Sequence, residues 1–158
     1  MNIVFARIDN RLLHGIVMTQ YLPSSGAKRI MVIDDDVATD PLKKDMMNMA
    51  KPLGTASSII TLEKAIENIK VDKYKDQPIF FLTKSPVTVL KVAELGVKFP
   101  FLMIGCTDML NQGHKLSSRA FLTDEELEAC KKLRDMGVKI TVQHNPQVQE
   151  ADMWKVVE

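Results

Sequence analysis

The segment Asn2-Ile3-Val4-Phe5-Ala6 is a short apolar run that ends where the polar residues from Arg7 onward begin. Short runs rich in β-branched and aromatic residues are typical of buried strands. Runs of this kind recur along the chain and alternate with longer segments in which apolar residues follow a helical period. This alternation predicts an α/β protein, in which repeated strand and helix units build a mainly parallel sheet.

Seven apolar runs are predicted as strands of one open, mainly parallel sheet with helices on both faces. They comprise residues 2–6, 29–33, 57–60, 79–82, 101–104, 118–121 and 139–142. The chain has 158 residues, of which 46% are hydrophobic and 26% charged. This size and composition fit a single domain over residues 1–158 that buries a sizeable core.

Three helix starts are marked by capping residues. Asp40-Pro41 and Ser85-Pro86 each place a capping side chain before a proline at the first helical position. Thr123 and Glu126 have the spacing of a capping box, and Gly137 is suited to end the helix that follows.

Other segments are less strongly patterned. The stretch between Ile104 and Ser118 predicts a loop of functional length. Residues 145–158 are expected to pack on the body of the protein as a short helix or strand. Met46, Met47 and Met49 lie in a helical segment, where methionines are expected to fill the core.

Charge and cysteine content exclude several classes of protein. Lys and Arg total 21 against 20 Asp and Glu, so the net charge of +1 predicts no binding to nucleic acid. No apolar run approaches the roughly 20 residues of a membrane span. Cys106 and Cys130 lack the spacing of a zinc site or a disulfide framework. We therefore expect a cytoplasmic protein with reduced thiols and no metal site.

The densest chemical grouping directly follows the first predicted strand and reads Arg7-Ile8-Asp9-Asn10-Arg11-Leu12-Leu13-His14-Gly15. Ligands of open α/β sheets bind at the carboxyl ends of strands, where a starting helix offers free N–H groups to an anion. Arg7 and Arg11 supply guanidinium groups, and His14 supplies a nucleophile that is substantially neutral near pH 7. The pattern indicates an anion or phosphoryl site, although a histidine in such a position is often structural.

Asp9 has two possible roles in this segment. It can accept a hydrogen bond from an arginine, which we favour, or from one imidazole nitrogen, so that the other is left free to attack phosphorus. The residues alone do not distinguish Nδ1 of His14 from Nε2 as the reacting atom.

This segment closely resembles the phosphorylation-site motif of IIB proteins from the mannose, fructose and sorbose family of bacterial phosphotransferase systems, commonly written Arg-Ile-Asp-x-Arg-Leu-[Leu/Ile/Val]-His-Gly-Gln-Val. The resemblance covers residues 2–142 and includes residues 32–40, residues 80–86 and the Gly113 loop. Two positions depart from the family pattern. Ile16 replaces the usual glutamine, and Cys106 stands where the family often has a second glycine after Gly105.

The resemblance implies a phosphocarrier, a protein-N(pi)-phosphohistidine–sugar phosphotransferase. His14 would accept a phosphoryl group through Nδ1 from a phosphohistidine of a IIA protein, and transfer it to a sugar held by membrane IIC and IID components. Arg7, Arg11 and the backbone near Gly15 would bind the phosphate. No cofactor or metal is needed, because phosphoimidazole is itself reactive and the protein has chiefly to position the groups and screen charge. The family also implies peripheral association with the membrane transporter and a homo-oligomer.

Further residues follow other predicted strands at the same sheet edge. Asp34, Thr83 and Ser85 are predicted to support the site, although capping of a helix by Ser85 is the stronger expectation. His114 and His144 lack metal-ligand spacing. Two alternatives stay open. One is a regulatory binding module that phosphorylation of His14 switches without transfer to sugar, and the other is an aspartate-based receiver built on residues 34–36.

Overall fold

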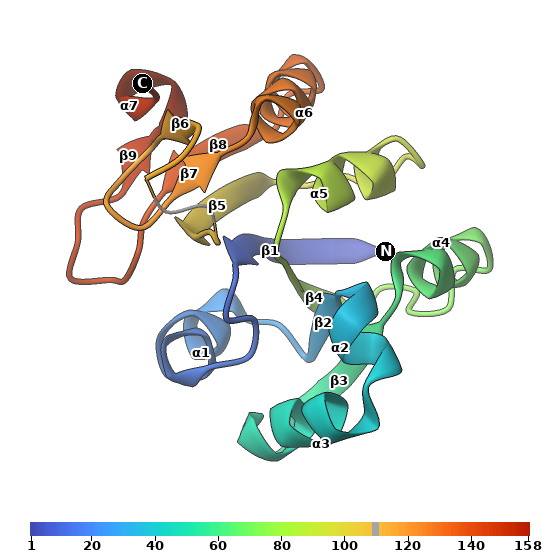
Figure 1. Cartoon of the computed structure of the whole chain (residues 1–158). Helices are drawn as coiled ribbons and strands as arrows, with labels where there is room; N and C mark the ends of the chain where they lie inside the picture. The colour runs from blue at the N-terminus through green and yellow to red at the C-terminus, as the bar shows by residue number, and fades with distance from the viewer. Residues whose placement is uncertain (109–110) are drawn as a thin grey trace.

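The computed structural model describes residues 1–108 and 111–158, and its centre is a sheet (Figure 1). In these residues the sheet has seven strands in the order β3-β2-β4-β1-β5-β8-β9. In chain order, they are β1 (Asn2–Asp9), β2 (Arg29–Ile33), β3 (Ala56–Ile60), β4 (Pro78–Thr83), β5 (Phe101–Cys106), β8 (Lys139–Val142) and β9 (Ala151–Asp152). All neighbouring pairs are parallel except β8 with β9. The predicted α/β class and mainly parallel sheet are confirmed.

Helices cover both faces of this sheet, as Figure 1 shows. One face carries a π-helical turn (Val17–Tyr21) that continues into α1 (Leu22–Ser25), together with α2 (Asp35–Thr39) and α3 (Pro41–Ala50). The other face carries α4 (Leu62–Lys70), α5 (Pro86–Ala93), α6 (Asp124–Asp135) and α7 (Met153–Val156). None of the helices in the described ranges has the length and apolar character to cross a bilayer.

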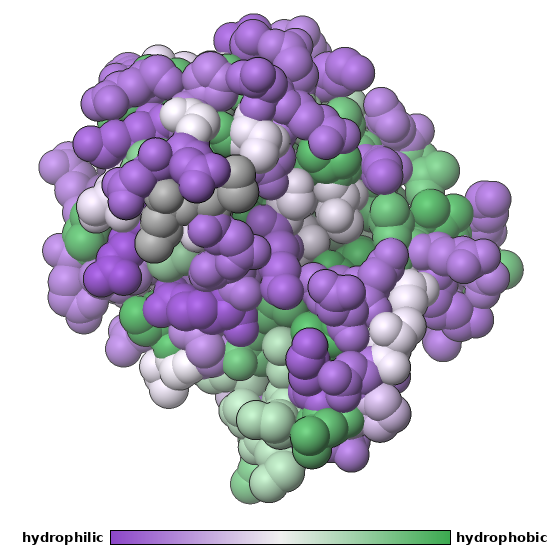
Figure 2. All heavy atoms as spheres, viewed as in Figure 1, coloured by the Kyte–Doolittle hydropathy of each residue, from purple (hydrophilic) through white to green (hydrophobic). Residues whose placement is uncertain are grey.

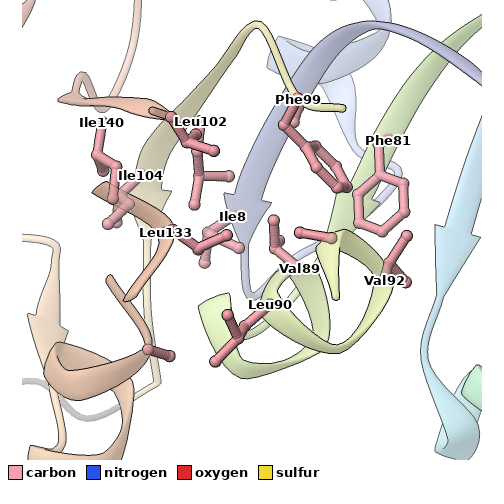
Figure 3. Close-up of a cluster of buried hydrophobic side chains, with 14 of the residues drawn as sticks. Ile8, Phe81, Val89, Leu90, Val92, Phe99, Leu102, Ile104, Leu133 and Ile140 are labelled. Carbon is pink, nitrogen blue, oxygen red and sulfur yellow. The ribbon is translucent and has the colours of Figure 1, made fainter. Parts of the chain in front are cut away.

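The inner strand β4 explains why the sheet needs a layer of helices on each face. Ile79 and Phe81 point into the core under α5, whereas Phe80 and Leu82 point into the core under α1. Figure 3 shows Phe81 beside Phe99, and the centroids of these two rings are 5.0 Å apart in an edge-on arrangement. Burying a side chain of this size stabilises the fold by about 1.5–3 kcal/mol. A continuous apolar run thus becomes a strand buried on both faces.

The predicted helix caps are present. The Asp40 side chain accepts hydrogen bonds from the backbone N–H groups of the first turn of α3, and Ser85 caps α5 in the same way. Thr123 and Glu126 form a complete capping box at the start of α6. These three predictions are confirmed. A cap depends only on residues within one turn of the helix start, so its spacing in the sequence is enough to predict it.

The predicted strand at residues 118–121 is wrong. Residues 117–119 form bends, and only Phe121 enters a strand, β7 (Phe121–Leu122), which pairs with β6 (His114–Lys115) in a separate two-stranded sheet. The Thr107 hydroxyl donates a hydrogen bond to the Phe121 carbonyl and accepts one from the Phe121 N–H, each at 2.8 Å. These two bonds take the place of those that a neighbouring strand of the main sheet would make. The seventh strand is β9, from the tail, and Met153 of α7 is fully buried behind it. Packing of the tail is therefore confirmed.

The predicted burial of the methionines on α3 is also wrong. This helix contains no fully buried residue, and Met46 and Met49 are 62% and 85% exposed. Figure 2 shows apolar surface over α3 at the bottom of the view. Only Met47 packs against the core, because α3 is the outer helix of its layer. The predicted loop between Ile104 and Ser118 includes residues 109 and 110, which lie outside the described residues.

The order of strands defines where a ligand would bind. From β1 the chain continues to β2 on one side of the sheet, and from β5 it continues to β8 on the other side. Adjacent parallel strands whose connections diverge leave a crevice at their carboxyl ends. In this sheet that crevice lies between Asp9 at the end of β1 and Cys106 at the end of β5, which are partners in the strand register.

Candidate functional site

A buried carboxylate stands at the centre of this crevice. The side chain of Asp9 is fully buried. One of its oxygens, Oδ2, lies 3.1 Å from Nη2 of Arg7 and 3.2 Å from Nε2 of His14. The other, Oδ1, accepts a hydrogen bond from Nε of Arg11 at 3.0 Å. The carboxylate thus accepts hydrogen bonds from both arginines, the role favoured from the sequence, and the imidazole lies beside it without such a bond.

A tight turn after β1 brings these side chains together. The Asp9 carbonyl accepts a hydrogen bond from the Leu12 N–H at 3.0 Å, and Oδ1 of Asp9 accepts one from the Arg11 N–H at 3.1 Å. Leu12 has a φ of 56°, which costs a residue other than glycine about 1–2 kcal/mol. The Leu12 side chain is fully buried, and this burial offsets the cost of the turn. The chain therefore folds back and places Arg11 and His14 over Asp9.

His14 is held at the surface rather than inside the core. Its side chain is 17% exposed, but its Nε2 atom is buried against Asp9. The two atoms are close, yet the N–H direction is too far off line for a hydrogen bond of good geometry. The helix begins directly after His14, with a first hydrogen bond of 3.0 Å from the Met18 N–H to the His14 carbonyl. Gly15 is exposed at this helix start.

Arg7 occupies a different environment from Arg11. Its side chain is fully buried, and its guanidinium group lies over the Tyr21 ring at 4.3 Å from the centroid. All five of its N–H groups have acceptors, which are Oδ2 of Asp9, Sδ of Met103 and the carbonyls of Gln143 and His144. No donor is left for an external anion. The geometry therefore does not support the prediction that Arg7 binds phosphate directly, whereas the Arg11 side chain is 37% exposed.

Gly105 on β5 makes room for Arg7, a requirement that sequence reasoning missed. A Cβ atom at this position would overlap Nη2 and Cζ of the Arg7 guanidinium. A glycine inside a strand often marks such a close approach, so the signal was available in the sequence. The group that approaches it was not identifiable from sequence spacing.

The charges around Asp9 keep it ionised. Burial alone would raise the pKa of Asp9, but the His14 contact, the hydrogen bond from Arg11 and the charge of Arg7 outweigh it and hold that pKa well below its usual range. An anionic Asp9 favours a proton on the ring nitrogen that faces it, Nε2 of His14. The lone pair of the neutral ring then resides on Nδ1.

Two residues beside the site were not predicted as part of it. The Cys106 sulfur lies 3.4 Å from Nη2 of Arg11 and 3.2 Å from Nδ1 of His144. Burial raises the pKa of the Cys106 thiol. Burial and the charge of Arg11 lower the pKa of His144. Sequence reasoning considered His144 only as a metal ligand, although its place at the end of a strand was a signal for this sheet edge.

The three residues predicted to support the site have other partners. Asp34 caps α2 and lies 3.5 Å from the Lys84 amine, and the Thr83 hydroxyl donates to the Ile33 carbonyl at 2.9 Å. Ser85 caps α5 and donates to Glu126 at 2.8 Å. All three line a neighbouring cavity of 320 Å³, whose lining does not include His14. The expected capping role of Ser85 is thus confirmed, and the geometry gives no direct link from these residues to His14.

Comparison with known proteins connects this geometry to a family. The family model described as "PTS system sorbose subfamily IIB component" matches residues 3–158. The chain belongs to this family. It is therefore a IIB component of a phosphotransferase system for sugar uptake, as the resemblance of the His14 segment predicted.

Relatives and solved structures agree over nearly the whole chain. The sorbose-specific EIIB component of Klebsiella pneumoniae is 32% identical over 89% of this IIB chain and 85% of its own. The N-acetylgalactosamine-specific enzyme IIB component 2 of Escherichia coli (strain K12) is 31% identical over 99% of both chains. The crystal structure of the IIBSor domain of the sorbose permease from Klebsiella pneumoniae has a TM-score of 0.88 at 30% identity, and the match covers 98% of this chain and 95% of that one.

Proposed function

We propose that this IIB component carries a phosphoryl group on His14, which it accepts from a phosphohistidine of a IIA protein and passes to a sugar bound by membrane IIC and IID components. The observation that carries the proposal is the position of the imidazole. Its Nε2 atom is held 3.2 Å from the buried carboxylate of Asp9, while part of the ring stays exposed at the crevice between β1 and β5. A histidine in this arrangement is both oriented and reachable.

The transfer follows from the state of the ring. The Nδ1 lone pair of His14 attacks phosphorus, the P–N bond to the donor histidine breaks, and the released donor imidazole takes up a proton. Asp9 keeps the proton on Nε2 and stabilises the positive charge that develops on the ring, as a carboxylate does for a catalytic imidazole. In the second step a sugar hydroxyl attacks phosphorus and loses its proton, and the bond between phosphorus and Nδ1 breaks. The burial of Nε2 supports attachment at Nδ1.

The two arginines have different roles in this proposal. Arg11 is part-exposed and already lies beside Asp9, so we assign it to the phosphoryl oxygens, together with the backbone N–H groups at the helix start near Gly15. Arg7 is a positioning residue. Its buried guanidinium fixes Asp9 from below and ties the end of β1 to the backbone after β8. This assignment replaces the predicted contact between Arg7 and phosphate.

The sugar is selected elsewhere in this proposal. The names of the two relatives specify different sugars, sorbose and N-acetylgalactosamine, although both chains share the IIB fold. We therefore assign the choice of sugar to the membrane components. IIA and those components would reach the same exposed edge of His14 in turn, from the cytoplasmic side, so their binding is expected to be mutually exclusive.

Labelling with phosphoenolpyruvate tests the proposal. Incubation with the general phosphotransferase proteins and IIA should add a single phosphate that is labile in acid and stable in base. His14→Ala should lose it. The matched control is His114→Ala, because His114 is another part-exposed histidine that contacts a carboxylate, at 2.7 Å from Asp124. Label that persists on His14→Ala contradicts the site.

A second step separates a carrier from a switch. The labelled protein is mixed with membranes that contain the IIC and IID components and with candidate sugars. The proposal expects the label to move to a sugar. A protein that keeps its phosphate with all sugars tested would act as a regulatory module instead.

A further inference from the structure

The Cys106 side chain bridges the site and the end of a third strand. Its sulfur lies between Nη2 of Arg11, at 3.4 Å, and Nδ1 of His144, at 3.2 Å. These residues come from the turn after β1, the end of β5 and the segment after β8, which are neighbours only because of the strand order.

The chemistry of the three groups determines which group donates and which accepts in each hydrogen bond of the bridge. A guanidinium group only donates hydrogen bonds, so Arg11 donates to the sulfur. The thiol has one hydrogen of its own, and the ring nitrogen of His144 is the acceptor within reach. This direction requires a neutral thiol and a neutral imidazole. Burial raises the pKa of Cys106, and burial together with the charges of Arg11, Arg119 and Arg7 lowers the pKa of His144 against the opposing charge of Asp9, in accord with both requirements.

The far end of the bridge is anchored. The His144 carbonyl accepts a hydrogen bond from buried Arg7 at 2.9 Å. The preceding residue, Gln143, uses both ends of its side chain, because it accepts from the Tyr21 hydroxyl at 2.9 Å and donates to the Val148 carbonyl at 2.8 Å. His144 is thus a fixed point from which Cys106 can restrain the exposed guanidinium of Arg11.

We propose that Cys106 and His144 are positioning residues that hold the Arg11 guanidinium beside His14 for the incoming phosphoryl group. The inference rests on the proposed function and deepens it. Asp9 holds one side of the guanidinium, through Nε and Nη2 of Arg11, and the sulfur holds Nη2 from the other strand. A long, part-exposed arginine has considerable rotamer freedom, so a second anchor pre-organises it for the reaction.

A small phosphoryl donor tests this inference without any partner protein. Phosphoramidate transfers its phosphoryl group to an imidazole nitrogen. The P–N bond of the phosphoramidate breaks, and ammonia leaves. We expect Cys106→Ala and His144→Ala to slow labelling of His14 by about threefold to tenfold, the effect of one weak hydrogen bond. Cys106→Ser and His144→Asn keep a donor and an acceptor in place, so labelling is expected within about twofold of the unmodified rate. Alanine variants that label as fast as the unmodified protein overturn the inference.

A double-mutant cycle separates positioning from general structure. If Cys106 acts through Arg11, Cys106→Ala has no further effect on the labelling rate once Arg11→Ala is present. If the two losses multiply, Cys106 acts independently of Arg11 and the inference is overturned. If an alanine variant fails to fold, the labelling rates of His144→Asn and His144→Gln are compared instead. Only asparagine places its oxygen where Nδ1 lies, so only His144→Asn should keep the unmodified rate.

A spectroscopic measurement keeps this inference distinct from the proposed function. In the unphosphorylated protein, exchange of the Arg11 guanidinium protons with water is followed by NMR. Exchange should be faster in Cys106→Ala and His144→Ala than in the unmodified protein, and restored in Cys106→Ser. Unchanged exchange overturns the bridge. Absence of label on His14 in the unmodified protein contradicts the proposed function instead, and leaves this measurement to decide the positioning role.

Discussion

Replacing Gly105 by alanine tests how the buried part of the site is built. The new Cβ atom would overlap Nη2 and Cζ of Arg7 and lie 3.0 Å from its Nε. Nothing flexible can yield, because the guanidinium group is fully buried and bonded on every side. It must move away from the carboxylate of Asp9 or from the carbonyls after β8.

The cost of this movement is estimated from the bonds it breaks. A hydrogen bond to a charged group contributes about 1.5–3 kcal/mol, so the loss of two such bonds costs about 3–6 kcal/mol. Breaking a buried ion pair by removing one partner costs about 3–5 kcal/mol, which agrees with this range. We therefore expect Gly105→Ala to lower the free energy of unfolding by about 3–6 kcal/mol.

Urea unfolding measures the effect, and Gly15→Ala is the matched control. A Cβ atom at Gly15 would meet no atom within 4 Å, so this variant should stay within about 1 kcal/mol of the unmodified protein. If Gly105→Ala also stays within about 1 kcal/mol, Arg7 does not need the space at Gly105 and the account of the buried cluster is wrong.

Three further predictions concern charge and capping. Because the pKa of Asp9 is lowered in the folded protein, its contribution to stability is complete above about pH 4 and is lost as the pH falls further. The difference in urea midpoint between the unmodified protein and Asp9→Asn should therefore narrow from pH 7 to about pH 3, and a constant difference would contradict the ionised Asp9. Arg11→Ala should slow phosphorylation of His14 by at least about tenfold, with Arg11→Lys intermediate, whereas Lys84→Ala should leave the rate unchanged; equal rates in all three variants would remove Arg11 from the site. Thr123→Ala should lower the free energy of unfolding by about 0.5–2 kcal/mol through loss of the capping box of α6, and an unchanged urea midpoint would show that the cap contributes nothing.

Local features of the sequence predicted most of the fold. The caps at Asp40, Ser85 and Thr123 depend on residues within one helical turn. The strands β2, β4 and β5 were predictable as continuous apolar runs because both of their faces are buried. Residues 118–121 failed as a strand because the Thr107 side chain, distant in sequence, satisfies the backbone of Phe121. The burial of the α3 methionines was predicted wrongly because helical spacing does not show whether a helix has other elements packed on its outer side.

The candidate site was predictable to the extent that it is contiguous in sequence. Asp9, Arg11 and His14 lie within a single turn, and the structure brings them together. Cys106 and His144 join them only because β5 and β8 follow β1 in the sheet, an order that single-sequence patterns do not reveal. The burial of Arg7 was likewise hidden, because an arginine after an apolar strand is more often exposed.

The nitrogen that carries the phosphate is the most direct test of the central claim. The protein is labelled with ¹⁵N in its histidine rings, phosphorylated, and examined by NMR through the couplings between phosphorus and the ring nitrogens. With Nε2 of His14 buried against Asp9, the account predicts phosphorus bonded to Nδ1. Phosphorus bonded to Nε2 of His14 would contradict it.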